Sequence, residues 1–206
     1  MSETRSGPLS FFGSELVLGI MIGLLSIGTA GASYLSAMSD SDQTKYNLKG
    51  MQILTDANSE YLTANQDIIQ DYTNFDSYYL NSDDTEKSDY YQGNFSEALQ
   101  ANMERPGDTV FDEQYYDDMY AYPNGLFDEA DQWFVIGEGF NTRGDQFQLV
   151  VLIGAIGLAF AAWASLLGEG RNMRLLFGAL SVIIFLLALY VFLFQVPPAP
   201  VLPPGA

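Results

Sequence analysis

The stretch LVLGIMIGLLSIGTAGASYLSA, residues 16–37, contains no Asp, Glu, Lys or Arg. Two further stretches share this property: FQLVVLIGAIGLAFAAWASLL at 147–167 and LLFGALSVIIFLLALYVFLF at 175–194. A helix needs about 20 such residues to span the hydrocarbon core of a bilayer. The sequence therefore predicts an all-α membrane protein with three transmembrane helices, at 16–37, 147–167 and 175–195.

The charged residues are concentrated between the first and second apolar stretches. Residues 38–146 carry 23 acidic and 5 basic side chains, and this segment accounts for the whole net charge of −18. Such a surface repels nucleic acid, so we expect no nucleic-acid partner. The segment is predicted to be an acidic helical domain outside the membrane.

Arginines next to the spans predict the orientation, because Lys and Arg in short loops stay on the cytoplasmic side. Arg5 precedes the first span, and Arg171 and Arg174 lie between the second and third. We therefore expect an integral protein of a prokaryotic cytoplasmic membrane, with its first span retained as an anchor. The predicted organisation is a cytoplasmic amino terminus at 1–15, an extracytoplasmic acidic domain at 38–146, a cytoplasmic turn at 168–174 and an extracytoplasmic Pro-rich tail at 196–206.

The chain contains neither Cys nor His. Thiolate or imidazole metal sites, disulfides, and Ser-His or Cys-His nucleophile pairs are thereby excluded. All three lysines, Lys45, Lys49 and Lys87, lie outside the spans, which argues against a Schiff base within the membrane. We expect a protein that is not an enzyme and has no organic cofactor.

Small side chains recur at steps of three and four along the first two spans. In membranes, small residues at this spacing allow two helix backbones to approach closely. We expect the two stripes to face each other, whereas the bulkier third span faces lipid or a partner. The predicted packing residues are Gly19, Gly23, Ser26, Ala30, Ser33 and Ala37 in span one, and Gly154, Gly157, Ala161, Ala164 and Gly168 in span two.

Apolar residues continue at helical spacing beyond both spans, downstream as far as Tyr72 and upstream from Leu126. This pattern predicts an antiparallel hairpin stalk that extends spans one and two outward, with a small cap of helices and loops at 73–125. Within the cap, Ser96 is a predicted helix N-cap. The sequence Tyr122-Pro123-Asn124-Gly125 is predicted to be a turn that leads into the returning helix.

The densest acidic cluster lies in the cap. Carboxylates four residues apart share a helix face and repel each other unless a cation or a basic group neutralises them. A calcium site is one interpretation and a solvated acidic surface, suited to high salt, is the other. The candidate ligands are Asp108, Asp112, Glu113, Asp117 and Asp118. The tyrosines of the cap likewise have two interpretations, as a binding surface or as the local core.

The layout of residues 19–72 and 131–194 resembles an uncharacterised family of small bacterial and archaeal membrane proteins. Members of this domain-of-unknown-function family have one amino-terminal span, a helical segment outside the membrane and a carboxy-terminal pair of spans. The resemblance covers more than half of the chain and is carried by layout and helix texture, without a catalytic motif. It implies the fold and no activity.

Three functions are compatible with these features. The first is a non-catalytic accessory or scaffold subunit, which docks on a larger membrane complex through its spans, its tail and its acidic domain. The second is a homo-oligomer, a pore or a surface array, in which the small-residue stripes join neighbouring copies. The third is a cation sensor built on the acidic cluster. We expect the lipid bilayer and other membrane subunits as partners.

Overall fold

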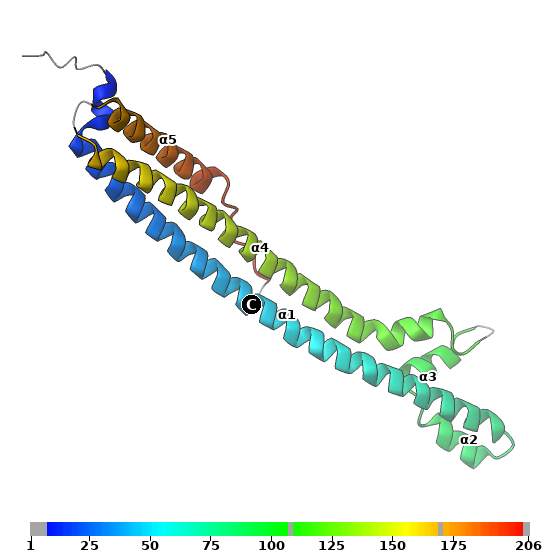
Figure 1. Ribbon diagram of the computed structural model, residues 1–206. Coiled ribbons are helices and arrows are strands. Elements are labelled where there is room, and N and C mark those ends of the chain that lie inside the picture. The colour runs from blue at the N-terminus through cyan, green and yellow to red at the C-terminus, as the bar shows by residue number, and fades with distance from the viewer. Residues whose placement is uncertain (1–7, 107–108, 169–170, 204–206) are drawn as a thin grey trace, which may run out of the picture. The chain divides into compact units, whose positions relative to one another are not determined.

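The computed structural model describes residues 8–106, 109–168 and 171–203, and these residues are helical or irregular, without strands (Figure 1). Long uninterrupted apolar or amphipathic runs favour helices over strands here. The elements in chain order are the short 3-10 helix η1 (Pro8–Gly13), α1 (Glu15–Leu80), α2 (Thr85–Gln92), α3 (Glu97–Met103), α4 (Glu113–Leu166) and α5 (Asn172–Phe194).

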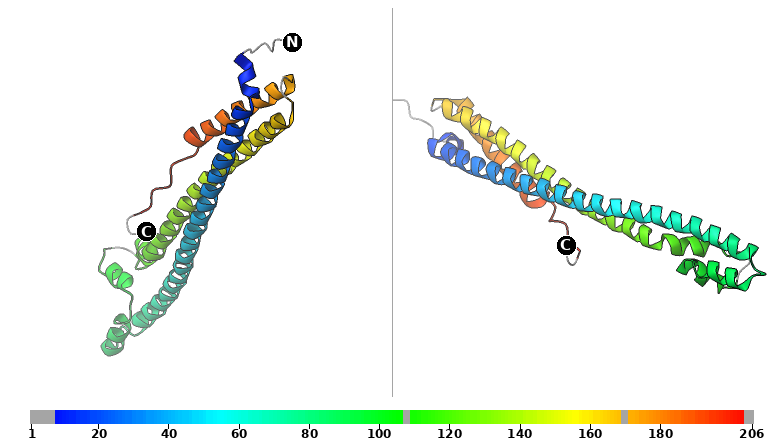
Figure 2. Two further views of the ribbon diagram at one scale, coloured as in Figure 1. Left: turned by 90° about the vertical axis from the view of Figure 1, so that its left-hand side faces the viewer. Right: turned by 90° about the horizontal axis from the view of Figure 1, so that it is seen from below.

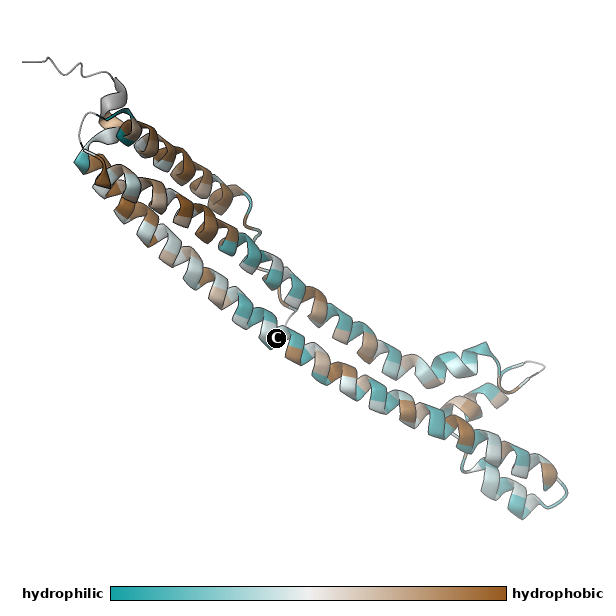
Figure 3. Cartoon of the chain, in the orientation of Figure 1, coloured by the Kyte–Doolittle hydropathy of each residue, from teal (hydrophilic) through white to brown (hydrophobic). Residues whose placement is uncertain are grey.

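Three of these helices, α1, α4 and α5, are long and apolar enough to cross a membrane. Figure 3 shows that α5 is apolar over nearly its whole length, whereas α4 is apolar in its carboxyl-terminal part. Most side chains of the three apolar stretches are exposed in the single chain, which is the expected state of helices that contact lipid. The predicted all-α class is confirmed for the described residues, and the three long apolar helices are consistent with a membrane protein.

The chain divides into two compact units, which we describe separately. Unit 1 comprises residues 1–46 and 135–206, and unit 2 comprises residues 47–134. Both α1 and α4 therefore contribute one segment to each unit. Gly137 and Gly144 lie within α4, so the glycine-rich part of that helix does not interrupt it.

In unit 1, α4 packs against both α1 and α5, and it is antiparallel to both (Figure 2). As the residue numbers of the contacts increase along α1 and α5, the residue numbers of their partners on α4 decrease. Towards α1 the pairs are Leu25 with Gly157, Thr29 with Gly154, Ser36 with Gly144 and Tyr46 with Phe140. Towards α5 they are Phe160 with Phe177, Gly157 with Ile184 and Phe147 with Phe192.

One buried cluster of unit 1 is made of small and branched side chains. Ala32, Val150, Ala188 and Val191 come from α1, α4 and α5 and form one cluster. At the amino-terminal end, η1 packs on α5, where a Cβ at Gly178 would collide with the carbonyl group of Phe12. Gly178 is thus required by the close approach of two backbones.

In unit 2, the segments of α1 and α4 are also antiparallel, and α2 and α3 lie between them in the chain. Gly50 approaches Phe134, Tyr61 stacks on Tyr120 with 5.0 Å between ring centroids, and Tyr72 stacks on Phe111 at 4.1 Å. The buried core consists of Ile68, Phe95, Leu99 and Tyr115.

Two local expectations in the cap had opposite outcomes. Ser96 is the N-cap of α3, as predicted, and its hydroxyl accepts a hydrogen bond of 3.1 Å from the Leu99 amide. The predicted turn around Pro123 is wrong, because Pro123 lies inside α4. The missing N–H of proline normally disfavours a helix interior. Here the ring is buried, so tertiary packing outweighs the local preference.

The tail after α5 continues along α4 in the same direction as α5. A Cβ at Gly139 would lie 2.7 Å from Cγ of Pro200, so the proline ring rests directly on the glycine backbone. The absence of a side chain at Gly139 makes this contact possible. The tail therefore contacts its own chain at Pro200, whereas the next residue, Val201, is 91% exposed.

Candidate functional site

The buried face of α1 in unit 1 is formed mainly by its larger side chains. Leu18, Met21 and Leu25 are at most 7% exposed, and Ala32 and Ser36 continue the same face towards the other end. These residues follow one another at steps of three, four or seven, so they lie on one side of the helix. This side packs against α4 and α5.

The small-residue stripe of α1 lies on a different side. Gly19, Gly23, Ser26, Ala30, Ser33 and Ala37 are all exposed. A Cβ built at Gly19 or Gly23 would meet no atom within 4 Å. In the part of the chain that the structure describes, these two glycines therefore have no packing partner.

The small residues of span two behave differently. Gly154, Gly157, Ala161 and Ala164 are buried, and only Gly168 is exposed. A Cβ at Gly157 would lie 3.1 Å from both Leu25 and Ile184, and one at Gly154 would collide with Thr29. The expectation that the two stripes face each other is thus wrong within one chain: Gly157 packs against Leu25 and Gly154 against Thr29, neither of which belongs to the stripe of α1.

Helical geometry separates α1 into three faces in unit 1. At about 100° per residue around the helix axis, the mean direction of the exposed small residues lies roughly 130° from that of the buried residues. The mean direction of the large exposed residues Leu16, Ile20 and Ile27 lies about 90° from that of the small ones, on the side away from the buried face. A face of large apolar residues suits lipid, whereas a face of small residues suits close contact with another helix. We name the exposed small-residue side, residues 19, 23, 26, 30, 33 and 37, the α1 small face.

A groove adjoins each side of the α1–α4 contact. The first has a volume of about 260 Å³, and its walls are α1 and α5, with Val150 and Gly154 of α4 at its base. The second, of about 540 Å³, lies between α1 and α4. Ser33 and Ala37 of the α1 small face line this second groove together with Gln148. The α1 small face therefore continues into a surface depression.

A buried arginine closes the amino-terminal end of unit 1. Arg174 is 4% exposed, and its Nε donates a 2.7 Å hydrogen bond to the carbonyl of Gly13. Its Nη1 donates a 2.9 Å bond to the carbonyl of Leu167, just after α4 ends. A cation at a helix carboxyl terminus also interacts favourably with the helix dipole. Arg174 thus joins η1, the end of α4 and the start of α5.

The most buried polar group of unit 2 is the carboxylate of Asp71, which is 1% exposed. Its Oδ1 accepts a 2.8 Å hydrogen bond from the amide of Ser96, and its Oδ2 accepts bonds from the hydroxyls of Ser96 and Tyr115. Three donors from two other helices surround one carboxylate, and this arrangement offsets the cost of burying a charge. Asp71 therefore holds α1, the start of α3 and α4 together.

Burial raises the pKa of the Tyr115 hydroxyl, and the adjacent Asp71 carboxylate raises it further. The phenol consequently remains protonated and serves as a donor at any physiological pH. Tyr115 is 0% exposed, and the neighbouring Tyr78, Tyr116 and Tyr120 pack against the same core. These tyrosines form the local core, whereas Tyr79, Tyr90 and Tyr122 are exposed.

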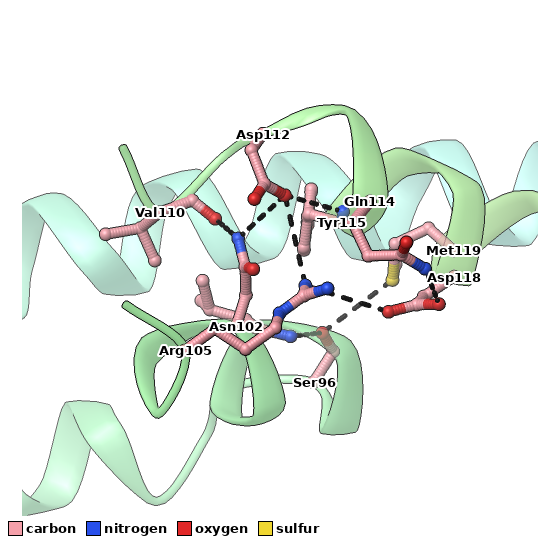
Figure 4. Close-up of polar contacts among 10 residues, drawn as sticks. Ser96, Asn102, Arg105, Val110, Asp112, Gln114, Tyr115, Asp118 and Met119 are labelled. Atoms are coloured by element: carbon pink, nitrogen blue, oxygen red, sulfur yellow. Dashed lines mark hydrogen bonds and ion pairs between the residues drawn. The ribbon is translucent and has the colours of Figure 1, made fainter. Parts of the chain in front are cut away.

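Two acids of the cap cluster, Asp112 and Asp118, lie beside an arginine of the same chain (Figure 4). Nη2 of Arg105 lies 3.9 Å from Oδ1 of Asp112 and 3.8 Å from Oδ2 of Asp118. Asp112 also accepts a hydrogen bond of 2.9 Å from the amide of Tyr115 in the first turn of α4, and Asn102 donates to it at 3.1 Å. The guanidinium is thus a neutralising group for two of the acids.

The remaining candidate calcium ligands do not converge. Glu113 and Asp117 are exposed, and Asp108 lies outside the described residues. Among the residues that the structure describes, no three acidic side chains are close enough together to hold a metal ion.

Sequence reasoning missed three of these residues: Asp71, Arg105 and Arg174 as buried or bridging groups. Asp71 and Arg105 look like ordinary members of a charged segment, and no local pattern marks them. A signal was available for Asp71, since it occupies a position three residues after Ile68 on the apolar side of the helix.

Neither a protein-family model, nor a curated protein, nor a solved structure matches this chain.

Proposed function

We propose that this protein is a non-catalytic accessory subunit that docks on another membrane protein through the α1 small face. It resides in a prokaryotic cytoplasmic membrane, with its amino terminus inside and its acidic domain and tail outside. The hairpin stalk predicted from the sequence belongs to this proposal, and the antiparallel pairing of α1 and α4 inside each unit supports it.

One observation carries the proposal: the small residues of α1 are exposed while its large ones are buried. No hydrophobic force drives helices together in lipid, so close backbone approach along small residues is the main source of association. A helix that faced only lipid on this side would gain nothing from Gly19 and Gly23. Their exposure is explained if the helix of another protein occupies this side.

The acidic surface supplies a second contact in this proposal. Glu113 and Asp117 are exposed on α4, and the described part of the chain contains no basic partner for either. A basic surface on the partner protein would complement them. Charge complementarity of this kind sets the specificity and the association rate more than the affinity, so the main docking energy is assigned to the α1 small face.

Site-directed cross-linking tests the proposal, and the absence of native cysteine makes the chain suitable. Ser26→Cys places a thiol on the α1 small face, and Ile20→Cys places one about 120° away on the same helix. Each variant, labelled with a photoactivatable maleimide in native membranes, is irradiated. We expect one discrete cross-linked protein from position 26 and only lipid adducts from position 20. Equal labelling of the same protein from both positions would contradict a specific docking face.

A homo-oligomer is the second candidate, because the same face could equally receive a second copy of α1. Oxidation of the Ser26→Cys variant in membranes distinguishes the two. A disulfide-linked dimer of this chain, together with a ring of this chain alone in native mass spectrometry, would replace the accessory subunit with a homo-oligomer. A mass equal to one copy plus a different protein would support the accessory subunit.

A further inference from the structure

The apolar groove between α1 and α5 is shaped by the way these two helices diverge. They meet at one end, where a Cβ at Gly178 would lie 3.4 Å from Leu18 and where Arg174 binds the carbonyl of Gly13. Further along α1 are Gly28 and Gly31, which carry no side chain. A Cβ built at either glycine would meet no atom within 4 Å. The space that they leave is the groove of about 260 Å³.

The walls of this groove are almost entirely hydrocarbon. Leucine and phenylalanine side chains of α1 and α5 form them, and Thr29 is the only hydroxyl-bearing residue in the lining. The Thr29 hydroxyl oxygen is itself inaccessible to solvent. Only an apolar occupant suits such a groove, because a polar one would lose its hydrogen bonds with water.

The size of the groove is compatible with an alkyl chain. A methylene group is similar in size to a water molecule, so a groove of about 260 Å³ has room for several carbons of a chain.

A cationic side chain lies above the base of the groove. Arg143, Phe147, Val150 and Gly154 are spaced at i, i+4, i+7 and i+11, so they share one face of α4. Val150 and Gly154 form the base of the groove, and the Arg143 guanidinium lies 5.5 Å from the ring centroid of Phe147. Phe147 in turn packs on Phe192, a wall residue, with 6.0 Å between centroids.

Arg143 has no acidic partner in the described structure. None of the ion pairs among the described residues includes it. Its nearest acids along the chain, Glu138 and Asp145, are about 140° and 160° away around the helix, so they project from the other side of α4. Arg143 lies about 10 Å from Val150 along the axis of α4, at a rise of 1.5 Å per residue.

We propose that this groove binds a phospholipid, with one acyl chain between α1 and α5 and the phosphate at the Arg143 guanidinium. Arginine binds phosphate through charge-assisted and frequently bidentate hydrogen bonds. The hydrocarbon walls and the cation on the same face of α4 match the two parts of such a molecule. The proposal concerns a different side of α1 from the small face, so it does not depend on the proposed docking.

Native mass spectrometry of the full chain, released from detergent micelles, measures the binding. The probes are phosphatidylglycerol and a diacylglycerol with the same two acyl chains. Gly28→Leu combined with Gly31→Leu fills the groove, and Ala162→Leu is the control, because it adds the same side chain at an exposed position of α4 outside the groove. Arg143→Gln removes the cation, and Lys45→Gln removes one charge from an exposed position on α1 as its control.

We expect one phosphatidylglycerol per chain, bound about tenfold more tightly than diacylglycerol. Arg143→Gln should abolish this preference and leave diacylglycerol binding unchanged, whereas Lys45→Gln should preserve it. The double leucine variant should lose both lipids, and Ala162→Leu should keep both. Helicity and melting temperature of the double variant, measured by circular dichroism, verify that it is folded.

Three results would overturn the proposal. One is retention of phosphatidylglycerol by a folded double leucine variant. Another is an equal preference for phosphatidylglycerol in the Arg143→Gln variant and the parent. The third is the loss of a second copy or of another protein, rather than of lipid, when the groove is filled, because the occupant would then be a protein.

Discussion

The hydroxyl of Tyr115 donates a 2.8 Å hydrogen bond to the buried carboxylate of Asp71, and the two residues are separated by 44 positions in the chain. This bond fastens the first turn of α4 to α1 inside unit 2. Because Asp71 also accepts from Ser96 at the start of α3, one carboxylate determines how three helices meet.

Removal of that carboxylate should destabilise unit 2. Asp71→Ala leaves three buried donors without an acceptor, and we expect a loss of about 2–4 kcal/mol, against about 1–2 kcal/mol for Tyr115→Phe. Amide hydrogen exchange across residues 93–120 of the full chain measures it. Asp67→Ala, on an exposed position of the same helix, removes the same charge and should change stability by no more than about 0.5 kcal/mol. Equal effects at Asp67 and Asp71 would refute the bridging role.

Unit 2 should become less stable at alkaline pH. The folded state raises the pKa of Tyr115 above its ordinary value of 10.0, so the folded state holds this proton more tightly than the unfolded state. The stabilisation is complete below pH 10.0 and is lost as the pH rises above it. We expect the free energy of unfolding to fall by about 1.4 kcal/mol per pH unit more in the parent than in Tyr115→Phe. Parallel pH profiles for the two proteins would show that the hydroxyl does not titrate as described.

Calcium should not stabilise the parent protein, because Arg105 already neutralises Asp112 and Asp118. We expect no change of melting temperature up to millimolar calcium. Arg105→Gln should lower stability by about 1 kcal/mol, and calcium should then restore part of the loss. A calcium-dependent rise of the melting temperature in the parent would instead support the cation-sensor interpretation of this cluster.

Two glycine substitutions should separate packing within the chain from packing between chains. Gly157→Leu places a side chain against Leu25 and Ile184, and we expect a loss of about 1–3 kcal/mol in detergent. Gly23→Leu meets no neighbour within the chain, so the melting temperature of the purified chain should not fall. The same Gly23→Leu variant should fail to recover the proposed partner from native membranes. Its normal recovery would exclude the α1 small face as the docking surface.

The membrane spans were predictable because their length and lack of charge leave few alternatives. The cap at Ser96 was predictable for a similar reason, since a hydroxyl before a helix satisfies local amides. The helical conformation at Pro123 was not predictable, because its burial inside α4 depends on residues distant in sequence. The two small-residue stripes have nearly identical patterns, yet one is buried and the other exposed. Spacing identifies a face suited to close packing and does not specify which helix will cover it.

Asp71 and Arg105 show the same limit for polar groups. Each is one of many charged residues in the acidic domain, and its role arises from neighbours that only folding supplies. The groove above Val150 could not be predicted from the sequence either. It results from the divergence of α1 and α5, and this divergence depends on the contacts at the other end of the two helices.

Arg174 imposes an order on biosynthesis. The carbonyl of Gly13 leaves the ribosome before its donor, which lies 161 residues later at the start of α5. The first span can enter the bilayer alone, yet the contact at its amino-terminal end cannot form until α5 has been inserted. A helix translated later is the one that fastens the first.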